Sequence, residues 1–245
     1  MWFLLLLAGL WAGVQNALAG GGSFVTLPAL ILSGIDARAA NITSTIALFP
    51  GQVTTGIAGR KMVSGAEQLS FRALFVISIG GGVVGALLLL ATPANFFALM
   101  LPWLVLMATG LFAWGSFLRR TPESRKPLSP VAAGVMQFLI AIYGGYFGGG
   151  IGFLMLAALT IAGLPVRTAG ATKNVLAGVM NGAAVIIFAF SHDVKWLAAV
   201  VLGAGAIVGG LIGAWMLRFV NEKALKVGVV ILGLVLTVGL FLRGS

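Results

Sequence analysis

The chain has 245 residues, of which 60% are hydrophobic and only 8% are charged. Soluble domains carry about 25% charged residues, so this composition excludes an ordinary soluble domain and predicts an integral membrane protein. The net charge of +10 would suit nucleic-acid binding in a soluble protein, but here the basic residues lie mostly between apolar segments, which favours a role in membrane orientation. The chain has no cysteine, which excludes disulfides, thiolate metal sites and cysteine nucleophiles.

The first predicted element is an apolar segment that a glycine run interrupts. Residues 2–19 and 23–33 flank the run Gly20-Gly21-Gly22, and three consecutive glycines should break a helix. As a helix, the arm 23–33 would span roughly 16 Å, about half of a bilayer core of about 30 Å. We therefore expect a re-entrant hairpin that enters and leaves the membrane on one side. The alternative is a first arm that crosses the membrane fully.

Three apolar stretches of about the length of a spanning helix follow, and the whole pattern then recurs. Gly22 aligns with Gly150 at a spacing of 128 residues, and Thr43 aligns with Thr172 at 129. The first copy has its long stretches at 39–58, 71–92 and 95–118. The second copy has a broken segment (131–147, the glycines, then 151–162) and long stretches at 168–190, 196–217 and 227–243. We expect the additional glycine clusters 80–82 and 209–213 to be helix-packing faces.

This duplication predicts an all-α polytopic membrane protein built from two repeats. The first membrane repeat is 1–118, the linker is 119–129 and the second membrane repeat is 130–245. Each repeat is expected to contain one broken re-entrant hairpin and three transmembrane helices.

The distribution of charge predicts that the two repeats have opposite orientations. The linker 119–129 carries four basic residues and is therefore placed in the cytoplasm. Counting crossings from the linker puts 11 basic residues in inside loops and 3 in outside loops. The loop with Asp36 and Arg38, the loop 192–195 and both termini then lie outside. One hairpin dips in from each side, which is the inverted repeat found in secondary transporters with a midplane site.

The hairpin tips are the predicted binding site. The arms 23–33 and 151–162 would begin at the tips, and helix N-termini present unpaired N–H groups and a partial positive charge that suit an anion. Ser23 is expected to act as the N-cap or to donate to the ligand. Polar groups within a membrane are costly, so those of the neighbouring stretches are added as candidates. The candidate substrate-binding residues are Gly20, Gly21, Gly22, Ser23, Asn41, Thr43, Ser44, Gln52, Gly148, Gly149, Gly150, Thr172, Lys173, Asn174 and Asn181.

These candidates also have structural alternatives. Lys173 would supply the one formal positive charge of the site, but it lies close enough to Arg167 to snorkel to the cytoplasmic surface. The hydroxyl groups could bond to their own helix or to a neighbouring one. His192-Asp193 could couple protons, although both residues lie in a predicted outside loop. Further residues flank the glycine runs and could line the cavity, namely Gln15, Asn16, Tyr143 and Tyr146.

The segment GGGSFVTLPALILSGIDARAANITST combines a glycine run, a proline a few residues later and an Ala-x-x-x-Thr-Ser motif. These features are Gly20, Gly21, Gly22, Pro28, Ala39 and Thr43-Ser44. The pattern resembles the amino-terminal signature of the sulfite exporter TauE/SafE family of membrane transporters, and GGGIGFLMLAALTIAGLPVRTAGATKNVL resembles the family's second copy. The resemblance implies transport of sulfur-containing anions such as sulfite, sulfonates or sulfoacetate across the bacterial inner membrane, without ATP hydrolysis.

The second copy departs from the first in two places. It has no proline that matches Pro28, and it has Lys173-Asn174 where the first copy has Ser44-Thr45. The two sides of the site are therefore expected to be unequal.

The predicted function is a secondary transporter of small sulfur oxyanions that works by alternating access. No catalytic constellation and no Walker-type motif occurs in the sequence, so we expect no enzymatic activity, no cofactor and no metal. The expected partners are the sulfur oxyanion and the lipid bilayer, with no nucleic acid, and a homodimer is left open. Two alternatives are a channel-like permease for other small anions or solutes and a non-transporting membrane partner.

Overall fold

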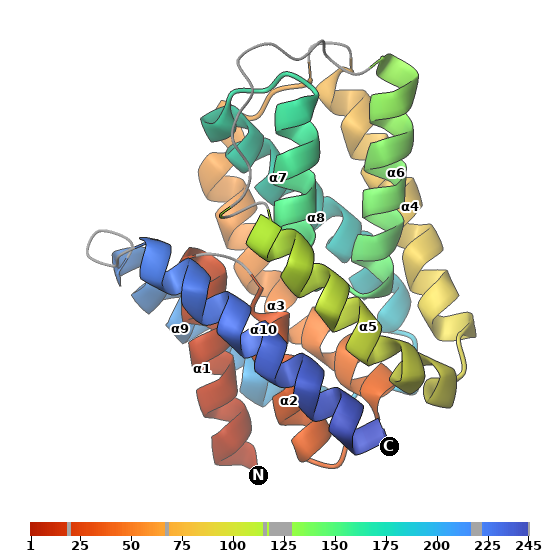
Figure 1. The fold of residues 1–245 in the computed structure, drawn as a ribbon, viewed down its shortest axis with the longest axis vertical. Coiled ribbons are helices and arrows are strands. Elements are labelled where there is room, and N and C mark those ends of the chain that lie inside the picture. The colour runs from red at the N-terminus through yellow and green to blue at the C-terminus, as the bar shows by residue number, and fades with distance from the viewer. Residues whose placement is uncertain (19–20, 67–68, 115–116, 118–128, 217–221, 245) are drawn as a thin grey trace.

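A computed structural model of the chain describes residues 1–18, 21–66, 69–114, 117, 129–216 and 222–244 (Figure 1). Within these residues the chain forms ten α-helices, one short 3-10 turn and no extended strand, which confirms the predicted all-α class. The first half contains α1 (Trp2–Leu18), α2 (Ser23–Leu32), α3 (Ala37–Gly59), η1 (Arg60–Met62), α4 (Phe71–Ala91) and α5 (Ala94–Ala113). The second half contains α6 (Pro130–Tyr146), α7 (Ile151–Ile161), α8 (Val166–Phe188), α9 (Trp196–Met216) and α10 (Glu222–Gly244). Most of the predicted linker lies outside the described residues.

Local sequence explains where several helices begin and end. The carboxylate of Asp36 accepts a hydrogen bond from the N–H of Ala39 at 3.0 Å, so α3 begins two residues earlier than the apolar pattern predicts. Ser70 and Ser129 cap α4 and α6 in the same way. Helix is interrupted where glycines adopt positive φ angles, at Gly21 in the first half and at 148 and 150 in the second.

The apolar surface of the molecule agrees with a multi-pass membrane protein. Among the described residues, four helices are long and apolar enough to cross a membrane, namely Phe71–Ala91, Ala94–Ala113, Thr168–Phe188 and Trp196–Gly213. Large apolar side chains cover their outer faces, including Trp103, Leu211 and Trp215. Such faces would be unfavourable in water and are favourable against lipid.

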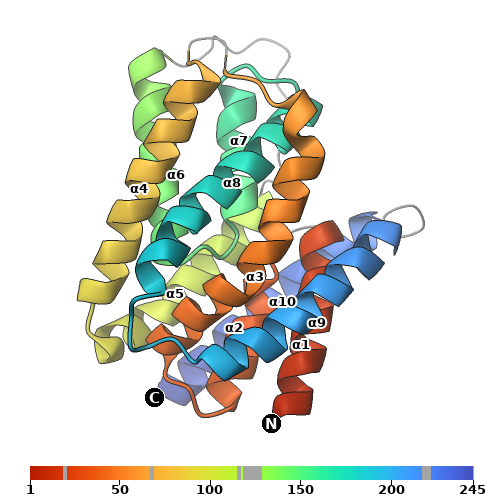
Figure 2. The same cartoon turned by 180° about the vertical axis from the view of Figure 1, so that it is seen from behind.

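The two halves pack against each other in an exchanged pattern. α1 of the first half packs along α9 of the second, and α6 of the second half packs along α4 of the first. α3 contacts α8, and α5 contacts α10. Figures 1 and 2 show that α3 and α8, which hold corresponding places in the two halves, run in opposite directions. This arrangement agrees with an inverted repeat, and the direction in which each half crosses a membrane stays a prediction.

Close helix packing explains many of the glycines. A Cβ atom added at Gly9 of α1 would overlap the backbone carbonyl of Leu202 in α9, and one added at Gly209 would overlap the carbonyl of Leu10. In the contact between α4 and α6, a Cβ atom added at Gly85 of α4 would overlap the backbone of α6. Backbones approach this closely only where side chains are absent, as is common between helices in lipid.

The prediction for the two additional glycine clusters is confirmed for some of their members. Gly81 and Gly82 face α6 and α8 at distances that leave no room for a side chain, and Gly209 does the same against α1. A Cβ atom added at Gly210 would meet nothing within 4 Å, and one added at Gly80 would make only an ordinary contact. Packing therefore excludes a side chain at Gly81, Gly82 and Gly209 but not at Gly80 or Gly210.

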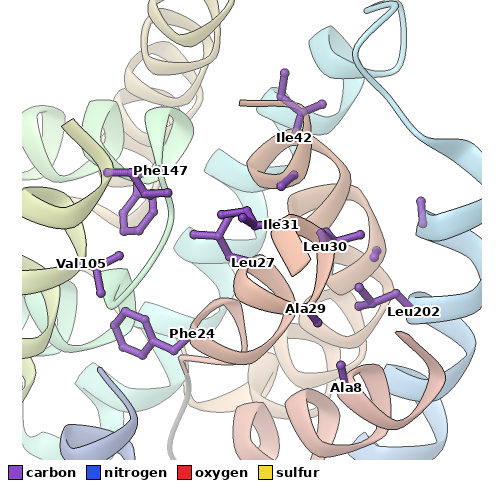
Figure 3. Packing of buried hydrophobic residues seen from close by; sticks show 14 of the residues in the cluster. Ala8, Phe24, Leu27, Ala29, Leu30, Ile31, Ile42, Val105, Phe147 and Leu202 are labelled. Atoms are coloured by element: carbon purple, nitrogen blue, oxygen red, sulfur yellow. The ribbon is translucent and has the colours of Figure 1, made fainter. Parts of the chain in front are cut away.

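The hairpin tips adjoin a buried apolar cluster. Figure 3 shows Phe24, at the start of α2, and Phe147, just before the second glycine turn, on either side of Val105. All three side chains are buried. Because the residues between the tips are apolar, an anion would find hydrogen-bond donors at one tip or the other rather than between the two.

Candidate functional site

The first glycine turn bonds to its own hairpin. The side-chain amide of Gln15 donates to the carbonyl oxygen of Gly21 at 3.1 Å, and the N–H of Gly22 donates to Oδ1 of Asn16 at 2.9 Å. Gly22 is the N-cap of α2, so Ser23 lies inside the first helical turn instead of capping it as predicted. The glycine at position 20 lies outside the described residues. The carbonyl of Gly21 and the N–H of Gly22 are therefore satisfied within the hairpin.

The second glycine turn keeps one of these bonds and lacks the other. The hydroxyl of Tyr143 donates to the carbonyl oxygen of Gly149 at 2.7 Å. At the repeat spacing of 128, these two residues correspond to Gln15 and Gly21. The position that corresponds to Asn16 is Gly144, which has no side chain to accept from a backbone N–H. The second turn thus lacks the acceptor that closes the first.

The neighbouring helices repeat this difference between the two tips. In the first half, the hydroxyl of Thr26 on α2 and that of Ser44 on α3 lie 2.5 Å apart, and both side chains are buried. Ser44 aligns with Lys173 on α8 at a spacing of 129. A Cβ atom built at Gly152, in the first turn of α7, would lie 3.5 Å from Nζ of Lys173. A neutral hydroxyl pair in one half is thus replaced by an amine in the other.

The side chain of Lys173 on α8 points toward the tip of the second hairpin, formed by α6 and α7. The side chain is half-buried, and its amine lies beside Gly152, at the end of α7 remote from the loop that joins α7 to α8. Snorkelling would direct the amine toward that loop, near the start of α8. The amine therefore points away from that loop, and its contact with a ligand stays a prediction.

A buried amide pair lies on the other side of the second turn. Nδ2 of Asn181 donates to Oε1 of Gln52 at 2.7 Å, and the two residues are repeat equivalents at a spacing of 129. Asn181 is only 3% exposed. Its Oδ1 has no hydrogen-bond partner, and a Cβ built at Gly148 would lie 3.9 Å from it. Two predicted site residues therefore meet directly, and Asn181 adjoins the second turn.

These groups form the second-turn site, which we define as the glycines 148–150, the first turn of α7, Lys173 and Asn181. The first N–H groups of a helix have no intrahelical partner and carry a partial positive charge. An ammonium group beside them adds a full positive charge. An oxyanion with several acceptor oxygens would match this set of donors.

Sequence comparison agrees with the fold. The family model described as "Sulfite exporter TauE/SafE" matches residues 5–240. The chain belongs to the TauE/SafE family. A "Probable membrane transporter protein" of Haemophilus influenzae is 28% identical over 237 residues, which cover 96% of this chain and 92% of that protein. A "Probable membrane transporter protein ORF9" of a Sinorhizobium species is 30% identical over 239 residues, which cover 96% of this chain and 90% of that protein. No solved structure matches the chain.

The TauE/SafE relatives are membrane transporters rather than enzymes, and this agrees with the multi-pass fold. A third relative, the "Probable membrane transporter protein YfcA" of Escherichia coli, is 27% identical over 242 residues, which cover 96% of this chain and 87% of that protein. The descriptions of all three relatives give membrane transport and name no substrate.

Several residues of the TauE/SafE signature and its second copy connect the halves. The hydroxyl of Thr43 accepts from the backbone N–H of Lys195 at 3.1 Å, in the loop before α9. The hydroxyl of its equivalent Thr172 both accepts from and donates to the backbone of Ser64, at 3.1 Å each. The side chain of Asn41 donates to the carbonyl oxygen of Tyr146 at 3.0 Å. These three candidates are therefore committed to structural bonds between the halves.

The remaining candidates are only partly brought together. Asn174 follows Lys173 on α8 and is half-buried. Its side chain makes no hydrogen bond to the part of the chain that the structure describes. Asp193, a candidate for proton coupling, pairs with Arg38 at 2.9 Å. The sequence indicates this pair, since Arg38 and Asp193 both lie in loops predicted to be outside and carry opposite charges. Their separation by more than 150 positions hid the contact.

Proposed function

We propose that the protein is a secondary transporter of small sulfur-containing anions, of the sulfite, sulfonate or sulfoacetate type, in the bacterial inner membrane. Membership of the TauE/SafE family supports transport, and the family description supports a sulfur oxyanion as substrate. The substrate binds at the second-turn site. The linker lies in the cytoplasm and both termini lie outside.

One observation carries this proposal. The amine of Lys173 lies against the first turn of α7, next to a glycine turn that lacks the side-chain acceptor present in the first half. An anion bound between the lysine amine and the helix N-terminus would interact favourably with both. Glycines allow the anion to approach the backbone closely.

The contacts between the halves suit alternating access. At one end of the molecule Thr43 bonds to the loop before α9, and at the other end Thr172 bonds to the loop before α4. These contacts are equivalent under the repeat, so breaking one set while keeping the other would open one end at a time. The tightly packed pairs α1–α9 and α4–α6 would move as units.

Transport by purified protein in liposomes tests the proposal. We expect saturable uptake of labelled sulfite with counterflow, and an approximately tenfold or larger rise in KM for Lys173→Gln, because a hydrogen bond to a charged group contributes about 1.5–3 kcal/mol. Lys173→Arg should retain part of the activity. Lys61→Gln removes an equal charge from an exposed position and should have no such effect.

Three outcomes would count against this assignment. Absence of transport of any sulfur oxyanion would reject the substrate class. Conductance without counterflow would favour a channel. Wild-type KM in Lys173→Gln would remove the second-turn site from the mechanism.

A further inference from the structure

Asn181 presents a buried hydrogen-bond acceptor to the second-turn site. Its Nδ2 is occupied by Gln52, so the amide orientation leaves Oδ1 facing Gly148 without a partner. The residue is 3% exposed and lies near the middle of α8, where lipid and protein supply no bulk water. An acceptor in such a place is costly unless a donor reaches it.

The amine of Lys173 and the amide oxygen of Asn181 flank the same short segment. Oδ1 of Asn181 adjoins Gly148, and Nζ of Lys173 adjoins Gly152, four residues later. The two side chains are eight residues apart on α8, about 12 Å along the axis, and the lysine side chain is directed toward the start of α7. A ligand over residues 148–152 would therefore meet donors at one end and an acceptor at the other.

We infer that the anion bound at the second-turn site carries its own hydrogen-bond donor, an O–H or N–H group that bonds to Oδ1 of Asn181. This inference rests on the proposed function and narrows its substrate class. Sulfite would bind as hydrogensulfite, with its proton on the oxygen that faces the amide. Among sulfonates, those with a hydroxyl or amino group near the sulfonate would bind better than those with an alkyl group only.

Transport of a ligand that carries its own proton would also couple movement of the anion to movement of a proton. When hydrogensulfite is bound on one side and released on the other, a sulfite dianion and one proton cross together with one net negative charge, and the proton is released to water if the ligand ionises there. No carboxylate in the membrane is required. Among the side chains that the structure describes on α8 and on the elements packed against it, the charged and titratable ones are Arg38, Arg60, Lys61, Arg72, Tyr143, Tyr146 and Lys173.

A pair of competitors that differ by one hydroxyl group tests the inference. Ethanesulfonate and 2-hydroxyethanesulfonate carry the same charge, and neither sulfonate titrates near neutral pH. In proteoliposomes of the wild-type protein we expect 2-hydroxyethanesulfonate to inhibit sulfite uptake at a roughly three- to tenfold lower concentration, as one net hydrogen bond predicts. Sulfite uptake should rise as pH falls through the second pKa of sulfurous acid, while 2-hydroxyethanesulfonate uptake should not follow that pKa.

Variants assign the effect to Asn181. Asn181→Leu should lose the preference for the hydroxylated competitor, and its KM for sulfite should rise because hydrogensulfite loses the same acceptor. Gln137→Leu is the matched control, because Gln137 is also a buried amide of a membrane helix, and its partner Ser78 keeps a bond to the carbonyl of Leu74. This control should retain the preference.

The wild-type comparison decides the inference even if Asn181→Leu does not fold. Equal inhibition by the two competitors, or stronger inhibition by ethanesulfonate, would overturn it, because the amide would then not act as an acceptor. Wild-type preference that persists in Asn181→Leu would also overturn it. Each of these results leaves sulfite uptake intact and so differs from failure of the proposed function, in which no sulfur oxyanion is transported.

Discussion

Arg38 and Asp193, which belong to different halves of the chain, form an ion pair of 2.9 Å. The guanidinium of Arg38 also donates to the carbonyl oxygens of Thr92 at 2.7 Å and Leu90 at 3.4 Å. One side chain at the start of α3 thus joins the end of α4 to the loop before α9. This end of the molecule must separate if it opens during transport.

The two partners of this ion pair should contribute unequally to stability. Asp193→Asn removes only the charge interaction, and because both side chains are about a quarter exposed we expect a loss of about 1 kcal/mol or less. Arg38→Gln also removes the bonds to the carbonyl groups and should cost about 2 kcal/mol. Unfolding of the detergent-solubilised variants measures both values. Equal losses would show that the carbonyl contacts contribute nothing.

Sidedness can be tested because the natural chain has no cysteine. Asp36 and His192 are exposed at the end of the molecule that contains the Arg38–Asp193 pair, and Lys61 is exposed beside η1. In intact cells, a membrane-impermeant maleimide should label Asp36→Cys and His192→Cys and leave Lys61→Cys unlabelled until the membrane is opened. The basis is the excess of basic residues in the loops assigned to the cytoplasm.

The labelling result can contradict the topology in two ways. Labelling of all three positions in intact cells would place both ends outside, which no spanning arrangement allows. Labelling of Lys61→Cys alone would reverse the molecule in the membrane and leave the fold unchanged.

Adjacent glycines of α9 should respond oppositely to alanine. A methyl group at Gly209 would overlap the carbonyl oxygen of Leu10, so Gly209→Ala should force α1 and α9 apart and destabilise the protein by roughly 1–3 kcal/mol. A methyl group at Gly210 would meet nothing within 4 Å, and Gly210→Ala should be neutral or slightly stabilising, since alanine favours helix. Thermal unfolding distinguishes the two, and similar shifts would show that the contact can relax.

The fold could largely be predicted from sequence because its signals are periodic and long. The apolar stretches 71–92 and 196–217 coincide with α4 and α9 to within one residue. Errors occur where a single side chain sets the boundary, as at Asp36, whose carboxylate caps α3. Apolar content does not report such caps.

The site was harder to predict because equivalent residues in the two halves have different partners. The sequence marked Ser44 and Lys173 as an unequal pair, yet it could not show that Ser44 bonds to Thr26. The sequence alone predicts that both tips donate to the anion together. The two tips differ because Asn16 accepts from the N–H of Gly22, whereas Gly144 leaves the second turn without that acceptor. Only a three-dimensional comparison of the halves reveals it.

The two tyrosines of α6 provide a final test of the second turn. The hydroxyl of Tyr143 donates to the carbonyl oxygen of Gly149 at 2.7 Å, whereas that of Tyr146 donates to the hydroxyl of Thr92 at 3.3 Å, outside the second-turn site. Tyr143→Phe leaves the Gly149 carbonyl unpaired beside the anion and lets the turn shift.

We therefore expect Tyr143→Phe to raise KM for sulfite roughly fivefold, as the loss of about 1 kcal/mol predicts, and Tyr146→Phe to leave KM within a factor of two. Both variants remove one hydroxyl group from the same helix, so general destabilisation would affect them alike. Equal effects on KM would mean that the geometry of the second turn does not control binding. An effect of Tyr146→Phe alone would move the site toward Thr92, where the end of α4 meets the Arg38–Asp193 pair.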